Sequence, residues 1–297
     1  MANPTPNSTS GAAAAADGGR RKVGADLPSR IAAGGVMIAA ALAAAWAGGL
    51  LFLAFWIVAA AAALWEWQTL IGGERLALRL SLGALTLLVG AALALGGFAW
   101  AALGALALGA LAAGLAAGSE SRARRWAGAG VLYAAALAAA PSLLRGDPTY
   151  GLPAILWLFA VVWMTDIMAY FGGRLIGGPK LWPRVSPGKT WSGALVGGLA
   201  GAACGAAVGL VAAPAGARFA PLVALGLAAS IVAQLGDLFE SAVKRRFHVK
   251  DSSHLIPGHG GVMDRLDGFV AAATFAALIG WARAGGDGVA AGLMVRW

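Results

Sequence analysis

The chain has 297 residues, of which 60% are hydrophobic and only 12% are charged. A soluble domain is close to one quarter charged, so this composition excludes an ordinary soluble fold. The formal net charge of +9 would suit a nucleic-acid-binding protein, but the sequence has no stripe of Lys and Arg interleaved with aromatic residues, and we expect no nucleic-acid partner. The apolar residues instead form long uncharged runs, which predict membrane-spanning helices.

The chain begins with a segment, residues 1–29, that is rich in Ala, Gly, Ser, Thr and Pro and predicts a disordered basic tail. We then predict nine spans, at residues 31–49, 50–71, 76–96, 98–117, 126–144, 151–171, 191–213, 219–243 and 267–284. The expected fold is an all-α polytopic helical bundle in the membrane. We divide it into N-terminal transmembrane helices over 30–149 and a C-terminal transmembrane region over 150–297, which carries two polar loops and, we expect, the chemistry.

The basic residues predict the orientation. With a cytoplasmic N-terminus, 18 of the 22 Lys and Arg fall in cytoplasmic segments, including Arg75 and Arg79 in the second–third loop. The four left outside are Arg145, Arg218, Arg283 and Arg296. Since cytoplasmic loops are enriched in Lys and Arg, this asymmetry places both polar loops at the cytoplasmic face.

The first polar loop, residues 164–193, ends in Pro-Gly-Lys-Thr, which invites comparison with a P-loop. A P-loop would need a glycine where the chain has Pro183, and no strand is predicted before it, so we reject that interpretation. Ser186, Lys189 and Thr190 remain beside a Gly-rich turn at the start of a helix, where free N–H groups favour an anion. Interfacial lysines with a simple helix cap are an equally open alternative.

The acidic residues near the cytoplasmic ends of the spans carry more information. Asp166 lies late in the sixth span, Asp237 and Glu240 are three residues apart in the eighth, and Asp264 and Asp267 repeat that spacing at the ninth. Ionisable groups in membrane segments are expensive and usually functional. Acidic pairs near several Lys and Arg suit a Mg²⁺ ion that holds phosphates, because Mg²⁺ prefers one or two carboxylates together with phosphate oxygens and water.

Other polar residues have simpler interpretations. For Glu240 we favour a salt bridge to Lys244, four residues on. Glu66, between two tryptophans, is interpreted as an interfacial anchor at the cytoplasmic end of the second span. His254 and His259 have no nearby cysteine to complete a zinc set, and His259 in its Gly-rich turn fits a phosphate-contacting or loop-ordering role.

Glycines in the seventh span recur every four residues, from Gly197 to Gly209. This spacing puts them on one helix face, where another helix can approach closely. The partner helix belongs either to the same bundle or to a second copy in a homodimer.

The polar block over 241–267 resembles the signature of the phosphatidate cytidylyltransferase family, also called CDP-diacylglycerol synthases. The matching positions are Ser241, Lys244, Arg245, Lys250, Asp251, Ser253, Pro257, His259, Gly260, Gly261, Asp264, Arg265 and Asp267. The resemblance covers roughly residues 150–285, while the N-terminal half is similar only in having several spans. Many relatives carry Glu where this chain has Ser192.

The resemblance implies a nucleotidyltransferase of phospholipid biosynthesis, an enzyme that condenses CTP with phosphatidic acid to give CDP-diacylglycerol and pyrophosphate. It implies Mg²⁺ as cofactor and more than one metal ion for the family. It also implies contact with membrane lipids, and an integral protein of the bacterial inner (plasma) membrane with its active site facing the cytoplasm.

The residues assigned to the site share a charged or polar side chain near the cytoplasmic ends of the spans. The metal ligands are Asp237, Asp264 and, in a supporting role, Asp267. The catalytic set is Asp237, Asp264, Lys244 and Arg245. The substrate-binding set is Ser186, Lys189, Thr190, Lys250, His259, Arg265 and Asp166.

Three other functions compete with this assignment. A CDP-alcohol phosphotransferase would need a clustered Asp motif that the sequence does not contain. A cation-coupled transporter would use Asp166, Asp237 and Asp267 as relay groups but needs acids on both sides of the midplane. A non-catalytic lipid-binding scaffold would tolerate loss of the metal-ligand acids.

Overall fold

The computed structural model describes residues 31–212, 218–256, 258–284 and 288–295. The predicted tail over 1–29 and Pro257 of the signature block lie outside the described residues. The described chain is nearly all helical, and eight of its helices are long and apolar enough to cross a membrane. The predicted polytopic bundle is therefore confirmed, and the chain is an integral membrane protein.

The elements follow one another as α2 (Gly49–Leu70), α3 (Leu76–Leu95), α4 (Ala99–Ala116), α5 (Ser121–Arg145), α6 (Gly151–Leu175), β1 (Lys180–Trp182), β2 (Ser186–Thr190), α7 (Trp191–Ala212), α8 (Phe219–Arg246), α9 (Met263–Ala284) and α10 (Val289–Met294). A shorter apolar helix, Ile31–Ala47, precedes them. It takes the place of the first predicted span and is near the lower length limit for crossing a bilayer. The predicted break between the first two spans is confirmed, because Gly48 and Gly49 have φ angles of 64° and 52°.

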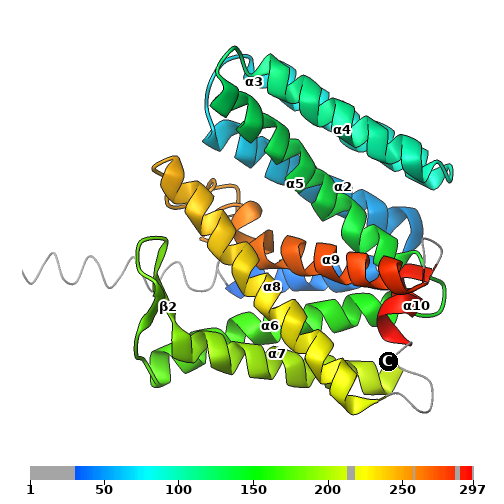
Figure 1. Cartoon of the computed structure of the whole chain (residues 1–297), viewed down its shortest axis with the longest axis vertical. Helices are drawn as coiled ribbons and strands as arrows, with labels where there is room; N and C mark the ends of the chain where they lie inside the picture. Colours follow the sequence, from blue (N-terminus) through cyan, green and yellow to red (C-terminus); the bar gives the residue numbers. More distant parts are fainter. Residues whose placement is uncertain (1–30, 213–217, 257, 285–287, 296–297) are drawn as a thin grey trace, which may run out of the picture.

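Helix α9 runs through the middle of the molecule (Figure 1). It contacts α5 and α2 on one side and α8 and α6 on the other, with α10 packed against its far end. Helices α3 and α4 pair at one edge of the bundle, and α6, α7 and α8 pack together at the opposite edge. The signature block therefore runs from the end of α8 through the following loop into the first turns of α9, the helix that lies between the two groups.

The glycine face of α7 packs inside the bundle. A Cβ added at Gly201 would lie 2.3 Å from the Thr165 hydroxyl of α6, and one added at Gly205 would lie 2.6 Å from Val161. Only glycine allows α6 to come this close. Of the two alternatives left open by the sequence, packing within the bundle is the one observed.

Two arginines form hydrogen bonds between helices, a role that the count of loop charges did not predict. Arg79 lies buried in α3, where it donates to Gln68 Oε1 at 3.1 Å and to the Gly72 carbonyl at 2.7 Å. Its interpretation as a cytoplasmic loop charge was wrong. Arg145, in the last turn of α5, donates to the Ala45 carbonyl at 2.7 Å. Both satisfy carbonyls at helix C-terminal ends, where a cation is favoured.

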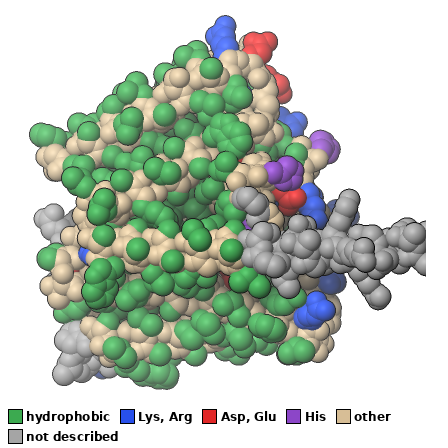
Figure 2. Space-filling model, turned by 180° about the vertical axis from the view of Figure 1, so that it is seen from behind, with side chains coloured by type: hydrophobic (Ala, Val, Ile, Leu, Met, Phe, Trp, Pro, Cys, Tyr) green, Lys and Arg blue, Asp and Glu red, His purple; other side chains and the backbone are tan. Residues whose placement is uncertain are grey.

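Charged and histidine side chains gather along one edge of the molecule, whereas apolar side chains cover most of the face seen in Figure 2. Exposed large hydrophobic residues occur on every long helix, as expected for a surface in contact with lipid. The polar edge is where the ends of α8 and α9, the loop between them and the β1–β2 hairpin are found.

Candidate active site

Small residues bring α8 and α9 together beside the predicted acids. A Cβ added at Gly236 would lie 2.7 Å from the Asp267 carbonyl, and one added at Gly268 would lie 3.0 Å from the Ala233 carbonyl. These two glycines are sequence neighbours of Asp237 and Asp267. The close crossing therefore places carboxylates from two helices at one depth, at the polar end of the bundle.

The β1–β2 hairpin delivers a lysine to α8. Its strands pair antiparallel, with Lys180 opposite Thr190 and Trp182 opposite Ser186. Lys189 on β2 forms an ion pair with Asp237 on α8, so two segments 48 residues apart meet at the site. The sequence had predicted no strands here, because a short hairpin rich in Pro and Gly has none of the apolar alternation that marks a strand.

Two further hairpin residues have local roles. Thr190 is buried and its hydroxyl accepts a hydrogen bond from the Gly193 N–H at 3.1 Å, so the helix-cap alternative is confirmed for this residue. Ser192, at the position where relatives carry Glu, donates to the Gly177 carbonyl and closes the turn before β1. Ser186 lies at the start of β2, half-buried.

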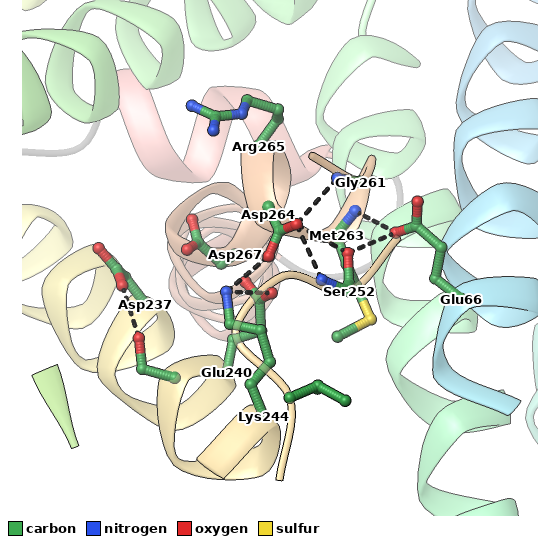
Figure 3. Close-up of polar contacts among 12 residues, drawn as sticks. Glu66, Asp237, Glu240, Lys244, Ser252, Gly261, Met263, Asp264, Arg265 and Asp267 are labelled. Atoms are coloured by element: carbon green, nitrogen blue, oxygen red, sulfur yellow. Dashed lines mark hydrogen bonds and ion pairs between the residues drawn. The ribbon is translucent and has the colours of Figure 1, made fainter. Parts of the chain in front are cut away.

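Asp264, at the start of α9, organises the loop that precedes it (Figure 3). Its Oδ2 accepts hydrogen bonds from the Ser252 N–H at 3.0 Å, the Ser252 hydroxyl at 3.0 Å and the Gly261 N–H at 2.8 Å. Its Oδ1 accepts from Lys244 Nζ at 2.6 Å. Lys244 also lies 3.1 Å from Glu240 Oε1, which confirms the predicted i, i+4 ion pair. Asp264 thus joins α8, α9 and the loop between them.

Glu66 of α2 is the residue that sequence reasoning missed. Its side chain is fully buried, so its interpretation as an interfacial anchor was wrong. Oε1 accepts from the Ser253 hydroxyl at 2.6 Å and the Val262 N–H at 2.8 Å. Oε2 accepts from the Ser252 hydroxyl at 3.1 Å and the Met263 N–H at 2.7 Å. A carboxylate from the N-terminal half therefore fixes the loop and the first turn of α9, where free N–H groups favour an anion.

Ser252 links the two carboxylates. Its hydroxyl lies 3.1 Å from Glu66 Oε2 and 3.0 Å from Asp264 Oδ2. A hydroxyl carries one proton and can donate to only one ionised carboxylate at a time. When the Ser252 hydroxyl donates to Glu66, Asp264 Oδ2 keeps only its two backbone donors. The contact with Glu66 therefore changes the number of hydrogen bonds that Asp264 accepts.

The remaining predicted basic residues line the polar edge. Arg245 donates to the Val249 carbonyl at 3.2 Å and Arg265 donates to the His259 carbonyl at 2.9 Å, so both brace the loop while their ends stay exposed. Lys250 is exposed on the same loop, and the backbone N–H of His259 donates to the Ile256 carbonyl at 2.9 Å. These cations surround the acids rather than neutralise them.

Asp166 comes from a third helix. It lies on α6, within electrostatic range of Asp237 and Lys189, and Asp267 on α9 is likewise within range of Asp237 and Asp166. The residues of the predicted site therefore lie at the polar end. Two of the acids are in ion pairs there, Asp264 with Lys244 and Asp237 with Lys189.

The expected Mg²⁺ would take its ligands from the acids at the polar end. Within the described parts of the chain, no group of three or more His, Cys, Asp or Glu is placed to hold a metal ion. A preformed cage is therefore not what these residues make. Asp237 and Asp264 lie at the polar end of the adjacent helices α8 and α9, and carboxylates are the side chains that Mg²⁺ takes when phosphate oxygens and water complete its octahedron.

Comparison with known proteins identifies the family. Residues 28–282 match the model of the cytidylyltransferase family. The chain belongs to this family. A phosphatidate cytidylyltransferase of Brucella abortus is 44% identical over 256 residues, which are 86% of this chain and 93% of that protein. One of Brucella melitensis is 46% identical over the same length and coverage. One of Bacillus subtilis is 42% identical over 127 residues, 43% of this chain and 47% of that protein.

The cytidylyltransferase match also begins much earlier than the signature block. The resemblance drawn from motifs extended only over residues 150–285, whereas the family model includes the N-terminal helices. Within that match, Glu66 of α2 holds the loop on which the signature residues lie. No fixed spacing relates position 66 to that block, so the motif alone could not identify it.

Proposed function

We propose that the chain condenses CTP with phosphatidic acid, releasing pyrophosphate and leaving CDP-diacylglycerol in the membrane, at the polar end where α8 and α9 cross. The family and the names of its relatives support the reaction. The observation that carries the location is the pair of carboxylates, Asp237 and Asp264, each held by a lysine at the same end of two neighbouring membrane helices.

The chemistry needs no dedicated base. The phosphomonoester of phosphatidic acid is largely doubly ionised near neutral pH, since the second pKa of a phosphomonoester is about 6. One of its oxygens attacks the α-phosphorus of CTP, a new P–O bond forms, and the bond to the β-phosphate oxygen breaks. Pyrophosphate leaves with the electron pair. Catalysis then consists mostly of alignment and charge neutralisation.

The protein supplies cations for two strongly anionic substrates. Lys189 and Lys244 pair with Asp237 and Asp264, so both ammonium groups lie at the proposed site, where they would meet the phosphates. Arg245, Lys250 and Arg265 extend the positive surface along the loop and are assigned to the triphosphate and the departing pyrophosphate.

Mg²⁺ would be held by Asp237 and Asp264, with Asp267 in support, and would neutralise phosphate charge when bound. Lys189 and Lys244, which pair with these carboxylates, would offer their ammonium groups to the phosphate oxygens beside them. Asp166, within range of Asp237, adds a further negative charge that favours a cation at this point.

The membrane context follows from the substrates. We place the protein in the bacterial inner membrane with its polar end in the cytoplasm, because CTP is a cytoplasmic metabolite and most Lys and Arg fall on that side. Acyl chains stay among the helices while the phosphate reaches the surface. A homodimer remains a proposal, and the α7 glycine face no longer argues for it because that face packs against α6.

The test is reconstitution. Purified protein in mixed micelles with phosphatidic acid, labelled CTP and Mg²⁺ should form labelled lipid and pyrophosphate in equal amounts. A CDP-alcohol phosphotransferase would instead consume CDP-diacylglycerol and release CMP, and a transporter or scaffold would form no product. Absence of lipid product from folded protein would refute the proposal.

A further inference from the structure

A cleft of about 250 Å³ lies between α5, α8 and α9, next to the acids. Helix α9 contributes Asp267, Val270, Ala271 and Thr274 to its wall. These positions are spaced i, i+3, i+4 and i+7, so they form one face of the helix. At 1.5 Å per residue the cleft follows α9 for about 10 Å from Asp267 toward the middle of the membrane.

The deep part of the cleft is apolar. The hydroxyl of Thr274 donates to the Val270 carbonyl at 2.7 Å, so its proton needs no hydrogen-bond acceptor on a ligand. Ala136 of α5 and Phe239 of α8 complete the wall. The Phe239 side chain is 50% exposed, which shows that the cleft opens at the side of the bundle, where lipid surrounds the protein. A flexible hydrocarbon chain is the ligand chemistry that suits such a space.

The polar end of the cleft contains a buried hydroxyl. Tyr133 of α5 also lines the cleft, and its ring packs on Trp67 with centroids 5.2 Å apart. Its Oη is inaccessible to solvent and has no hydrogen-bond partner within the described chain. Buried hydroxyl groups without a partner are uncommon and costly. This one lies within electrostatic range of Glu240 and Asp267.

We propose that this cleft holds one acyl chain of phosphatidic acid and that the Tyr133 side chain shifts on lipid binding, so that its Oη donates a hydrogen bond to the ester carbonyl of that chain. The inference rests on the proposed function, because Asp267 joins the cleft to the reacting phosphate. An uncharged ester oxygen is the acceptor that fits here, since Glu240 and Asp267 would oppose a second anion beside the phenol. The tyrosine thereby sets the depth of the glycerol backbone, and hence the position of the phosphate against CTP.

Tyr133→Phe gives the cleanest test. It removes only an oxygen that has no hydrogen-bond partner among the described residues, so the free energy of unfolding should stay the same or increase. The KM for phosphatidic acid should nevertheless rise about three- to tenfold, the effect of one neutral hydrogen bond, while the KM for CTP stays constant. A role in packing alone would leave both KM values unchanged.

Ala136→Leu tests the cleft itself by filling it. We expect turnover of long-chain phosphatidic acid to fall at least fivefold, while a water-soluble short-chain phosphatidic acid is used as by the wild type. Ala224→Leu is the matched control, because it makes the same enlargement of the side chain at a different place. Ala224 is exposed on α8 and does not line the cleft.

The outcomes separate the two proposals. A wild-type protein that makes no CDP-diacylglycerol refutes the function, whatever the variants do. A wild type that is active, together with Tyr133→Phe and Ala136→Leu variants whose KM values and chain-length profile match it, overturns the cleft assignment alone. If both variants instead lower the melting temperature in detergent and leave the KM for phosphatidic acid unchanged, the cleft holds a structural lipid and the assignment is equally overturned.

Discussion

The contact between Glu66 and the loop gives a prediction whose size can be worked from the structure. Each carboxylate oxygen accepts one serine hydroxyl and one backbone N–H. In Glu66→Gln, the amide NH₂ must replace one of these oxygens. In either position the amide NH₂ faces one serine hydroxyl and one backbone N–H. The hydroxyl can rotate and accept a hydrogen bond from the amide, but the backbone N–H can only donate. One buried hydrogen bond to a charged acceptor is therefore lost, at a cost of about 1.5–3 kcal/mol.

The lost hydrogen bond makes the loop and the first turn of α9 less ordered. We expect kcat/KM for CTP to fall about ten- to hundredfold, since 1.4 kcal/mol corresponds to a factor of ten. Under the proposed function CTP contacts the same loop, so we expect saturating CTP to restore its order and kcat at saturation to fall much less than kcat/KM. The assay is steady-state formation of CDP-diacylglycerol over a two-dimensional titration of CTP and Mg²⁺, with thermal unfolding in detergent measured alongside.

Two variants make the result decisive. Glu74→Gln changes the same side chain at an exposed position between α2 and α3 and should behave as the wild type. Ser253→Ala removes a single donor to Glu66 and should show a smaller shift in the same direction. A Glu66→Gln protein that folds and keeps the wild-type kcat/KM would refute the reasoning, because the loop would then be ordered by other contacts.

Three other predictions concern the acids and their lysines. Asp264→Asn should abolish CDP-diacylglycerol formation while leaving a folded membrane protein, and near-normal turnover would contradict its assignment as a metal ligand. Lys189→Met should raise the KM for CTP or phosphatidic acid about tenfold or more by removing a charge-assisted contact worth 1.5–3 kcal/mol, whereas Arg184→Met, in the exposed turn of the same hairpin, should not. Excess chelator should stop the reaction and added Mg²⁺ should restore it; persistence of activity under chelation would remove the case for Asp237 and Asp264 as ligands.

The architecture was largely predictable because the membrane imposes it. Spanning segments must satisfy their own backbone groups, so a run of apolar residues fixes both the helix and its approximate length. The ends were less predictable. Helix α9 begins at Met263, four residues before the predicted 267, because Glu66 and Asp264 accept the N–H groups of its first turn and of the loop before it. Hydropathy averaged over a short window cannot detect a helix cap such as Glu66, which comes from a helix nearly two hundred residues away in the sequence.

The site was predictable where its residues are close in sequence and unpredictable where they are not. Asp264 and Lys244 belong to one fixed pattern, and the structure pairs their side chains. Glu66 and Arg79 are single charges in apolar surroundings, and the sequence offered an interfacial role for one and a loop role for the other. Both are buried because each finds several hydrogen-bond partners at a helix end, which is a tertiary property.

These long-range contacts change how the two halves of the chain relate to each other. The polar loops belong to the C-terminal region, but the carboxylate that orders the second loop comes from α2, and the phenol beside the acids comes from α5. A carboxylate can hold that loop only if α2 is itself fixed, and α2 is fixed through Gln68, which donates to the Ala127 carbonyl of α5 and accepts from Arg79 of α3. A chain of hydrogen bonds therefore links α3 and α5, through α2, to the loop that Asp264 organises, and we expect changes in the N-terminal helices to alter the position of Asp264.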